Sequence, residues 1–451
     1  MNIWKNPLAI SFSDSINKFK QGIQTPRDLL ERYIDNFLTH EKLLKAFVSF
    51  DLEAARKAAD ESTKRYKNGQ QISIVDGLPI GVKDIMNTKG LPTQMGSPAF
   101  SGWESNFDCA AVYSLRQAGA IIFGKTVTTE FAVGYSGPTT NPFDSTRTPG
   151  GSSSGSAAAV GAGIISVGLG TQTQGSTLRP ASYCGVVGFK PTLGALNMAG
   201  IHPLSATNDH LGLIGASLED TWRVASQISL GIGSPGYGFL DGAGHELPIK
   251  IKPKKLIRLY TRGWSEIDSN TINEFEKLIS ALADKGVEII SKSEDQRVSD
   301  FEDTVENDID TALDIVAYEM QWPFKAYIEK FGTVIGERIH SLMKRADQIT
   351  PNQYLELLKK RQNIGKKCRN LLIDTGADSY ITLSASGPAP IGLKYSGSRS
   401  FIVLGSWLGF PAFSLPMLSV NQLPLGIQLL GLDGKDGQLC SLANWFVQEF
   451  E

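Results

Sequence analysis

Residues 146–175 read TRTPGGSSSGSAAAVGAGIISVGLGTQTQG and carry the main fold signal of this 451-residue chain. The stretch is rich in glycine and serine, a composition that flexible linkers share. Two apolar runs interrupt it, at 157–160 and 164–167, and a linker has no use for them. The pattern instead predicts a buried helix followed by a buried strand, with glycines that let the backbones pack closely.

Helix and strand signals alternate along the rest of the chain. Thr25-Pro26 and Thr350-Pro351 each join a hydroxyl residue that can cap a helix to a proline suited to its first position, so a helix is expected after each pair. Further helices are expected at 51–66, 110–118 and after 220, and strands at 78–82, 120–123, 256–260, 287–290 and 379–383. This alternation predicts an α/β fold with a central sheet.

The composition limits the classes of function. Lys plus Arg total 44 and Asp plus Glu total 46, for a net charge of −2, so no basic excess exists to neutralise a phosphate backbone, and no nucleic acid partner is expected. The four cysteines form no CxxC pair and are too few for a disulfide framework. No run of about 18 apolar residues predicts a membrane helix, and the first residues lack the apolar core of a secretory signal. A cytoplasmic enzyme that does not bind membranes is therefore the expectation.

Two short motifs match known catalytic patterns but lack the surroundings that those patterns need. Residues 119–126 fit the phosphate-binding loop GxxxxGK[ST], yet the variable positions are Ala, Ile, Ile and Phe, which predict a buried strand. Residues 151–155 fit the GxSxG nucleophile motif, but a loop and not an apolar strand precedes them. Of the five histidines, only His210 is kept as a candidate partner for a serine. No HExxH or CxxC pattern is present, so no metal site is expected.

Three segments together resemble the amidase signature family of serine hydrolases. They are GVKD at 81–84, PGGSSSGSAAA at 149–159, and GTQTQGS at 170–176 followed by Arg179. The family's catalytic lysine and two serines match residues separated here by 69 and 24 positions, namely Lys83, Ser152 and Ser176. Other family-like text covers nearly the whole chain, including 141–144, 185–192, 409–412 and 424–428. The form of the third segment is similar to the malonamidase-like branch.

The resemblance implies a Ser-cisSer-Lys triad that forms an acyl-enzyme. Ser176 would attack the amide carbon, and its proton would pass to Ser152, held by a cis peptide after Gly151, and then to Lys83. The ammonium group of a lysine has an ordinary pKa of about 10.4, so Lys83 must be buried to be neutral at physiological pH. The alternative for Lys83 is a salt bridge to a carboxylate, since Asp84 is its neighbour in sequence.

The oxyanion hole implied by the resemblance is made of the backbone N–H groups of Thr173, Gln174, Gly175 and Ser176. Gln174 departs from the family, which commonly has a small residue at this position. If the backbone of Gln174 were left-handed, the strain would be about 1–3 kcal/mol and activity would be impaired. Otherwise the Gln174 side chain is expected to reach into the pocket and select substrates.

Four side chains are candidates for substrate contact: Arg179, Gln172, Gln174 and Ser153. An arginine fork suits a carboxylate, so Arg179 either binds a carboxylate on the substrate or bonds loop carbonyls. Gln172 stands where the family commonly has Asp, and it removes a charge near the site. Ser153 either supports the proton relay or caps the following helix.

The resemblance also implies the architecture. It predicts one α/β/α domain over residues 1–451, with a large mixed sheet of about ten strands covered by helices. The signature catalytic core is expected at 60–230. A variable, mostly helical segment at 251–375 would wall the substrate pocket within the same domain, because function varies on segments grafted to a fixed core.

Three functions are weighed from the sequence. The first is an amidase that hydrolyses a carbon-nitrogen bond of a small amide, carboxylate-bearing if Arg179 binds the substrate, with no cofactor. The second is the glutamine-hydrolysing A subunit of a tRNA-dependent amidotransferase, which would pass ammonia to a partner chain; Gln172 counts against it, because Asp is typical of that protein. The third is a catalytically impaired relative that acts as a binding protein. A homodimer is compatible with each.

Overall fold

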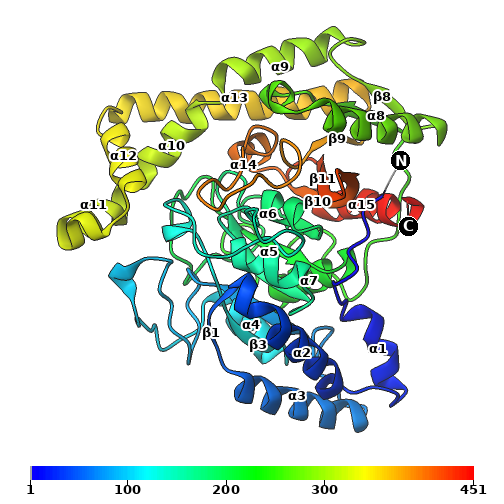
Figure 1. Ribbon diagram of the computed structural model, residues 1–451. Helices are drawn as coiled ribbons and strands as arrows, with labels where there is room; N and C mark the ends of the chain where they lie inside the picture. The colour runs from blue at the N-terminus through cyan, green and yellow to red at the C-terminus, as the bar shows by residue number, and fades with distance from the viewer. Residues whose placement is uncertain (1–2, 451) are drawn as a thin grey trace.

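A computed structural model describes residues 3–450 and shows one mixed sheet between two layers of helices (Figure 1). Across the sheet the eleven strands of this described range run in the order β1 (Phe47–Phe50), β3 (Ile121–Thr126), β2 (Pro79–Lys83), β4 (Val167–Gln172), β6 (His210–Gly215), β5 (Val187–Lys190), β10 (Ala412–Val420), β11 (Leu423–Leu430), β9 (Ser379–Leu383), β7 (Lys255–Arg258) and β8 (Glu288–Ile290). Strand β2 pairs in parallel with β3 and β4, and β7 with β8 and β9, while the remaining pairs are antiparallel. The predicted α/β fold is confirmed, with one strand more than the ten expected.

Fifteen α-helices accompany the sheet within the described range. They are α1 (Ser13–Lys20), α2 (Pro26–Leu44), α3 (Leu52–Lys67), α4 (Ala110–Gln117), α5 (Ser154–Gly161), α6 (Leu178–Tyr183), α7 (Leu218–Ile232), α8 (Ser269–Asp284), α9 (Gln296–Asp308), α10 (Thr311–Glu319), α11 (Gln321–Phe331), α12 (Glu337–Ala346), α13 (Pro351–Thr375), α14 (Val403–Leu408) and α15 (Asp436–Phe450). No helix of residues 3–450 is both long and apolar enough to cross a membrane.

Helix starts follow the capping signals in the sequence. Thr25 accepts a hydrogen bond from the N–H of Asp28, whose side chain bonds back to the N–H of Thr25, so α2 begins with a full capping box. Thr350 and Gln353 form the same arrangement at the start of α13. Both starts were predicted from the Thr-Pro pairs.

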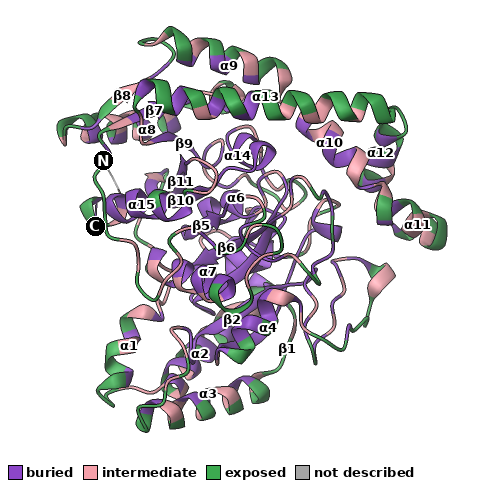
Figure 2. Cartoon of the chain, turned by 180° about the vertical axis from the view of Figure 1, so that it is seen from behind, coloured by how far each residue is buried: buried purple, intermediate pink, exposed green. Residues whose placement is uncertain are grey.

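Side chains on the strands alternate between two separate hydrophobic clusters. On β3, Ile121 and Phe123 belong to a cluster that includes residues of α2 and α5, whereas Ile122 belongs to the larger cluster on the opposite face with α4 and α7. The residues of both clusters are buried, and Figure 2 shows buried residues, in purple, concentrated around the strands. The sheet is thus covered on both faces, as its nearly uniform apolar strands require.

The glycine-rich stretch 146–175 is the centre of this arrangement and not a linker. It contains α5 and β4, both fully buried. A Cβ built on Gly168 would lie 2.8 Å from the Cβ of Ser156, and one built on Gly155 would lie 2.2 Å from the carbonyl oxygen of Ala46. These glycines let helix, strand and loop backbones approach more closely than any larger residue would allow. The strand begins at Val167, a little later than the apolar run 164–167 suggested.

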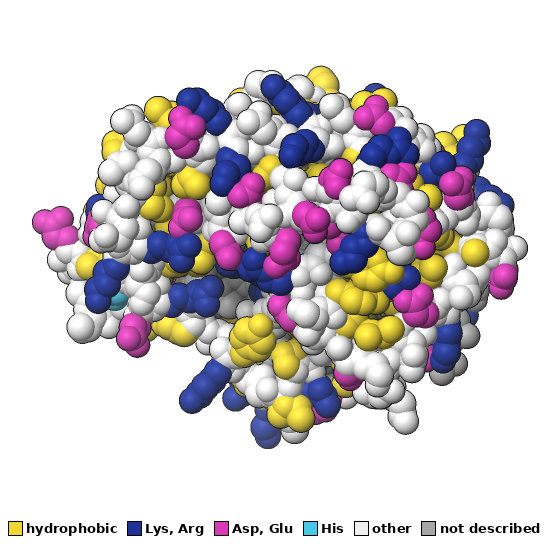
Figure 3. All heavy atoms as spheres, turned by 90° about the horizontal axis from the view of Figure 1, so that it is seen from above, with side chains coloured by type: hydrophobic (Ala, Val, Ile, Leu, Met, Phe, Trp, Pro, Cys, Tyr) yellow, Lys and Arg dark blue, Asp and Glu magenta, His cyan; other side chains and the backbone are white. Residues whose placement is uncertain are grey.

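Residues 251–375 hold the two strands at one edge of the sheet, β7 and β8, and the helices α8 to α13, and they form the upper part of the molecule in Figure 1. Helices α10, α11 and α12 extend to one side as an arm, joined back to the sheet by the long helix α13. The face seen from above is hollowed near its centre, with both basic and acidic side chains around the hollow (Figure 3).

Candidate active site

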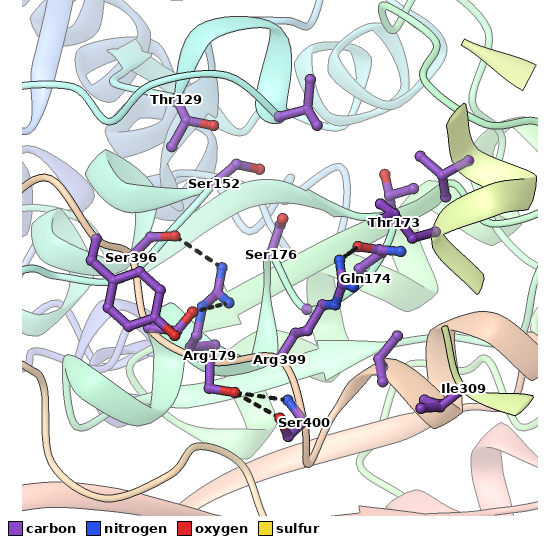
Figure 4. A pocket seen from close by; sticks show the side chains of 18 of the residues that line it. Thr129, Ser152, Thr173, Gln174, Ser176, Arg179, Ile309, Ser396, Arg399 and Ser400 are labelled. Carbon is purple, nitrogen blue, oxygen red and sulfur yellow. Dashed lines mark hydrogen bonds between the residues drawn. The ribbon is translucent and has the colours of Figure 1, made fainter. Parts of the chain in front are cut away.

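One pocket of about 520 Å³ brings together the segments that the sequence singled out (Figure 4). The turn that follows β4 supplies the four residues 173–176, and Ser152 lies beside it just before α5. The opposite walls come from residues of α9, α10 and α12 and from the segment 394–404. The pocket therefore lies where the sheet's central strands meet the helical segment.

Lys83 is the last residue of β2 and is completely buried. Its Nζ lies 2.7 Å from Ser152 Oγ and donates to Thr171 Oγ1 at 2.8 Å. Asp84 does not neutralise it, because the Asp84 carboxylate pairs instead with Lys125 Nζ at 3.1 Å. Among residues 3–450 no carboxylate lies within 4.0 Å of Lys83 Nζ, so the salt-bridge alternative is not what the structure shows.

Burial lowers the pKa of Lys83 well below its ordinary value, while the negative charge of Asp209 partly opposes this effect. Burial in turn raises the pKa of Asp209 to about 6, against the hydrogen bonds that it accepts from Thr173 Oγ1 and two backbone N–H groups. The amine of Lys83 thus has the surroundings that a neutral base needs.

The two serines are held on segments that bond to each other. The Gly151–Ser152 peptide bond is cis, as the resemblance implied. The N–H of Ser153 donates to the carbonyl oxygen of Ser176 at 3.2 Å, and the N–H of Thr129 donates to the carbonyl oxygen of Ser152 at 3.2 Å. Both serine hydroxyls project into the same space in Figure 4, and Ser176 is half-buried, so it is open to a ligand.

The turn expected to form the oxyanion hole lacks the backbone strain that was considered for Gln174. Neither Gln174 nor Gly175 has a positive φ, so the left-handed backbone considered for Gln174 does not occur. A Cβ on Gly175 would lie 2.3 Å from Ile402 Cδ1, so the Ile402 side chain packs directly against this turn. Thr173 is fixed by its bond to Asp209, at 2.7 Å.

Gln172 does not reach the pocket, which corrects its place among the substrate-binding candidates. Its Oε1 accepts the N–H groups of Thr177 and Leu178, both at 3.0 Å, and its Nε2 donates to Ser406 Oγ at 2.8 Å. The side chain is fully buried and its hydrogen-bonding groups are engaged within the protein. Gln172 therefore orders the backbone that follows Ser176 rather than binding a ligand.

Ser153 is also buried and does not line the pocket, so direct substrate contact is not what the structure shows. Its hydroxyl makes no capping bond to α5. It accepts instead from the N–H of Thr171 at 3.3 Å and donates to the carbonyl oxygen of Thr171 at 3.4 Å. Since Thr171 also bonds Lys83, Ser153 holds the end of β4, and with it a partner of Lys83, against the cis-serine segment.

Arg179 lines the pocket but has most of its donors engaged by loop atoms. Nη1 donates to the carbonyl of Gly397 and Nη2 to the carbonyl of Gly151, both at 2.7 Å, with a longer bond from Nη2 to Ser396 Oγ at 3.3 Å. This is the second of the two roles considered from the sequence, a bond to loop carbonyls. Arg179 thereby ties the peptide before Ser152 to the 394–404 segment.

The sequence did not point to the segment 394–404 as a pocket wall. Lys394, Tyr395 and Arg399 line the pocket from this segment, and Arg338 lines it from α12. The only signal was the Gly/Ser-rich text SGSRS at 396–400 before an apolar run, a pattern too short to separate from an ordinary loop. These cations become neighbours of Ser176 only through the fold.

The structure explains the match to a phosphate-binding loop at 119–126 and gives His210 a place outside the pocket. Residues 121–126 form the buried strand β3, and Lys125 Nζ bonds Asp84 and Thr93 instead of facing an open loop. His210 bonds the carbonyl oxygens of Gln172 and Asn208 through Nδ1 and does not line the pocket, so it is no partner for the serines. Within residues 3–450 no group of three or more His, Cys, Asp or Glu side chains is arranged to hold a metal ion.

Comparison with known proteins shows the family of this chain. A family model described as Amidase matches residues 28–440, and the chain belongs to that family, whose members act on carbon-nitrogen amide bonds. It is similar to the A subunit of the mitochondrial glutamyl-tRNA(Gln) amidotransferase of Homo sapiens, at 29% identity over 96% of this chain and 92% of the relative. The corresponding protein of Methanothermobacter thermautotrophicus is 28% identical over 96% and 98%. A solved crystal structure of an amidase matches with a TM-score of 0.84 and 26% identity, covering 98% of this chain and 100% of that one.

Proposed function

We propose that the chain hydrolyses small amides through Lys83, Ser152 and Ser176. Ser176 Oγ bonds to the carbonyl carbon of the amide while its proton passes to Ser152 Oγ and the Ser152 proton passes to Lys83 Nζ. The proton returns by the same route to the amine nitrogen as the carbon-nitrogen bond breaks. Water then cleaves the acyl ester and restores the Ser176 hydroxyl. The N–H groups of residues 173–176 stabilise the oxyanion at each addition step.

The observation that carries this proposal is the burial of Lys83 next to Ser152. Burying an amine with no carboxylate within 4.0 Å among residues 3–450 lowers the stability of the folded protein. The 2.7 Å bond to Ser152 Oγ places this amine where it can accept the proton of that hydroxyl. The cis-serine lies between Lys83 and the pocket that contains Ser176. A structural lysine would be expected to pair with the nearby Asp84, which it does not.

The test is ammonia release from a panel of small amides, hydrazides and ureas. The wild-type chain is expected to release ammonia from at least one of them without a partner protein. Ser176→Ala is expected to lower kcat by about 10⁴-fold or more, because loss of a nucleophile removes the covalent route. Turnover that survives this change would contradict the proposal.

We further propose that the preferred substrates carry a carboxylate, as in the malonamidase-like branch, and that the enzyme acts in the cytoplasm. The support for the first point is the set of arginines that line the pocket. Equal turnover of acidic and neutral amides by the wild-type chain would count against it.

A second candidate function rests on the curated relatives. Two of them are named as the A subunit of a glutamyl-tRNA(Gln) amidotransferase and match nearly the full length of this chain. In that case the chain would hydrolyse glutamine and pass ammonia to partner chains. Glutaminase activity that appears only with co-purified partners would favour this function over a free-standing amidase.

A further inference from the structure

The pocket carries an excess of positive charge. Its lining holds five basic side chains and three carboxylates, namely Arg179, Arg262, Arg338, Lys394 and Arg399 against Glu266, Glu306 and Asp310. Two of these carboxylates are already used, because Arg262 pairs with Glu306 at 2.8 Å and with Asp310 at 3.1 Å. The third, Glu266, accepts a hydrogen bond from Ser400 Oγ. The remaining cations have no carboxylate within 4.0 Å among residues 3–450.

Arg399 is a cation without a carboxylate partner that lies beside the turn 173–176. A Cβ built on Gly175 would lie 4.0 Å from the Cβ of Arg399. The Arg399 guanidinium donates to Gln174 Oε1, and Figure 4 shows the pair on the other side of Ser176 from Arg179. Burial lowers the pKa of Arg399, and the positive charge of Arg338 lowers it further. The charged form of Arg399 is therefore less stable in this pocket than in water.

The unsatisfied polar atoms of the pocket lining are donors. Gln174 Nε2 and Arg179 Nε are buried and have no hydrogen-bond partner among the described residues, and no buried lining acceptor of that range is left in the same state. A carboxylate offers two oxygens that accept several hydrogen bonds. A carboxylate bound beside Arg399 and Gln174 would therefore supply both the missing negative charge and an acceptor for Gln174 Nε2.

We infer that Arg399, oriented by Gln174, binds the carboxylate of a small amide whose reactive carbonyl lies at Ser176. Arg179 keeps its role as a clamp on the Gly151 carbonyl and is not the principal contact for the anion. The inference rests on the proposed amidase activity and specifies its substrate class. Gln174, which departs from the small residue common in the family, acquires a role as the residue that directs the guanidinium.

The experiment compares the monoamides of malonic, succinic and glutaric acid with neutral amides of the same chain length. The wild-type chain is expected to prefer an acidic member of this set. Arg399→Met is expected to raise KM for that substrate by about 30-fold or more while leaving KM for the neutral amide unchanged, since loss of one partner strands the other charge. Arg399→Lys is expected to restore part of the preference. Arg179→Met should weaken turnover of both classes together, and Arg116→Met, outside the pocket, should change neither.

A second measurement separates this inference from the proposed function. Ser176 is labelled with a fluorophosphonate in the presence of malonate, succinate or glutarate, and at least one acid should slow labelling of the wild-type chain but not of Arg399→Met. Normal labelling with no protection and no preference for acidic amides would overturn the role of Arg399 and leave the amidase proposal standing. Failure of Ser176 to react at all would contradict both. Thermal unfolding of each variant establishes that Arg399→Met is folded.

Discussion

Lys83 shows at the scale of one residue how function opposes stability. The side chain is completely buried, bonds two hydroxyls and has no counter-ion within 4.0 Å among residues 3–450. The folded state therefore favours the neutral amine, whereas the unfolded chain holds the proton up to the ordinary pKa of about 10.4. This difference in bound protons makes the stability of the fold depend on pH.

The first prediction concerns Lys83→Met. Above the lowered pKa of Lys83 and below about 10.4 the unfolded wild-type chain binds one more proton than the folded one, so its free energy of unfolding rises with pH by up to about 1.36 kcal/mol per unit. Lys83→Met lacks this contribution. The wild type should therefore gain stability relative to the variant as pH rises from neutral to about 10, as measured by urea unfolding.

Lys89→Met, which removes an exposed lysine, is the control for loss of one positive charge. A difference between wild type and Lys83→Met that stays constant with pH would mean that Lys83 is charged in the folded protein. That result would remove the base from the proposed mechanism.

The cluster of Lys83 and Ser152 beside the pocket that Ser176 lines could be predicted from the sequence, but the other walls of that pocket could not. Lys83, Ser152 and Ser176 occur in segments whose spacing and text are enough to identify them. Gln172 was misassigned because its neighbours in sequence line the pocket, while its own side chain points to the backbone of the next helix. Arg399 was missed because it lies 223 positions after Ser176 and meets it only in the fold.

At the scale of elements, the junction of β4 and β6 fixes the site. These strands are antiparallel neighbours, and Gln172 pairs with His210 in their register. Thr173 and Asp209 stand just beyond these ends and bond each other at 2.7 Å. The strand pairing thus brings the negative charge of Asp209 near Lys83 and holds Thr173, the first residue of the turn 173–176.

The second prediction is that Asp209→Asn moves the acidic limb of the kcat/KM profile to lower pH. The charge of Asp209 raises the pKa of Lys83, so its removal lets the amine become neutral at lower pH. The shift belongs to the range above pH 6, because burial raises the pKa of Asp209 to about 6 and the carboxyl is protonated below that value. A limb that moves to higher pH in Asp209→Asn would contradict the coupling.

The third prediction concerns the close packing of α5. A Cβ on Gly155 would lie 2.2 Å from the carbonyl oxygen of Ala46 and 2.4 Å from the nitrogen of Val127. Both are backbone atoms, which cannot move away without displacing their segments. Gly155→Ala should lower the free energy of unfolding by about 1–3 kcal/mol. The matched control is Gly365→Ala in α13, where a Cβ meets nothing within 4 Å and the change should stabilise by about 0.5–1 kcal/mol. Urea unfolding measures both, and equal effects would contradict the packing argument.

At the scale of the whole molecule, alternating helix and strand signals were enough to predict the α/β class. The short strand β1 was not predicted because α2 ends without a glycine, with Lys45 itself in the left-handed region at a φ of 53°, so the sequence shows no stop. The arrangement of α9, α10 and α12 around the pocket depends on contacts between distant segments, which local patterns do not encode.

The most direct test of the central claim is the rate at which a fluorophosphonate labels Ser176, mapped by mass spectrometry at several pH values. Ser176 is expected to be modified at a rate that rises with pH as a group with a pKa well below that of an ordinary lysine loses its proton, and both Lys83→Met and Ser152→Ala are expected to lose that reactivity. Labelling of another residue, or an unchanged rate in Lys83→Met, would contradict the claim.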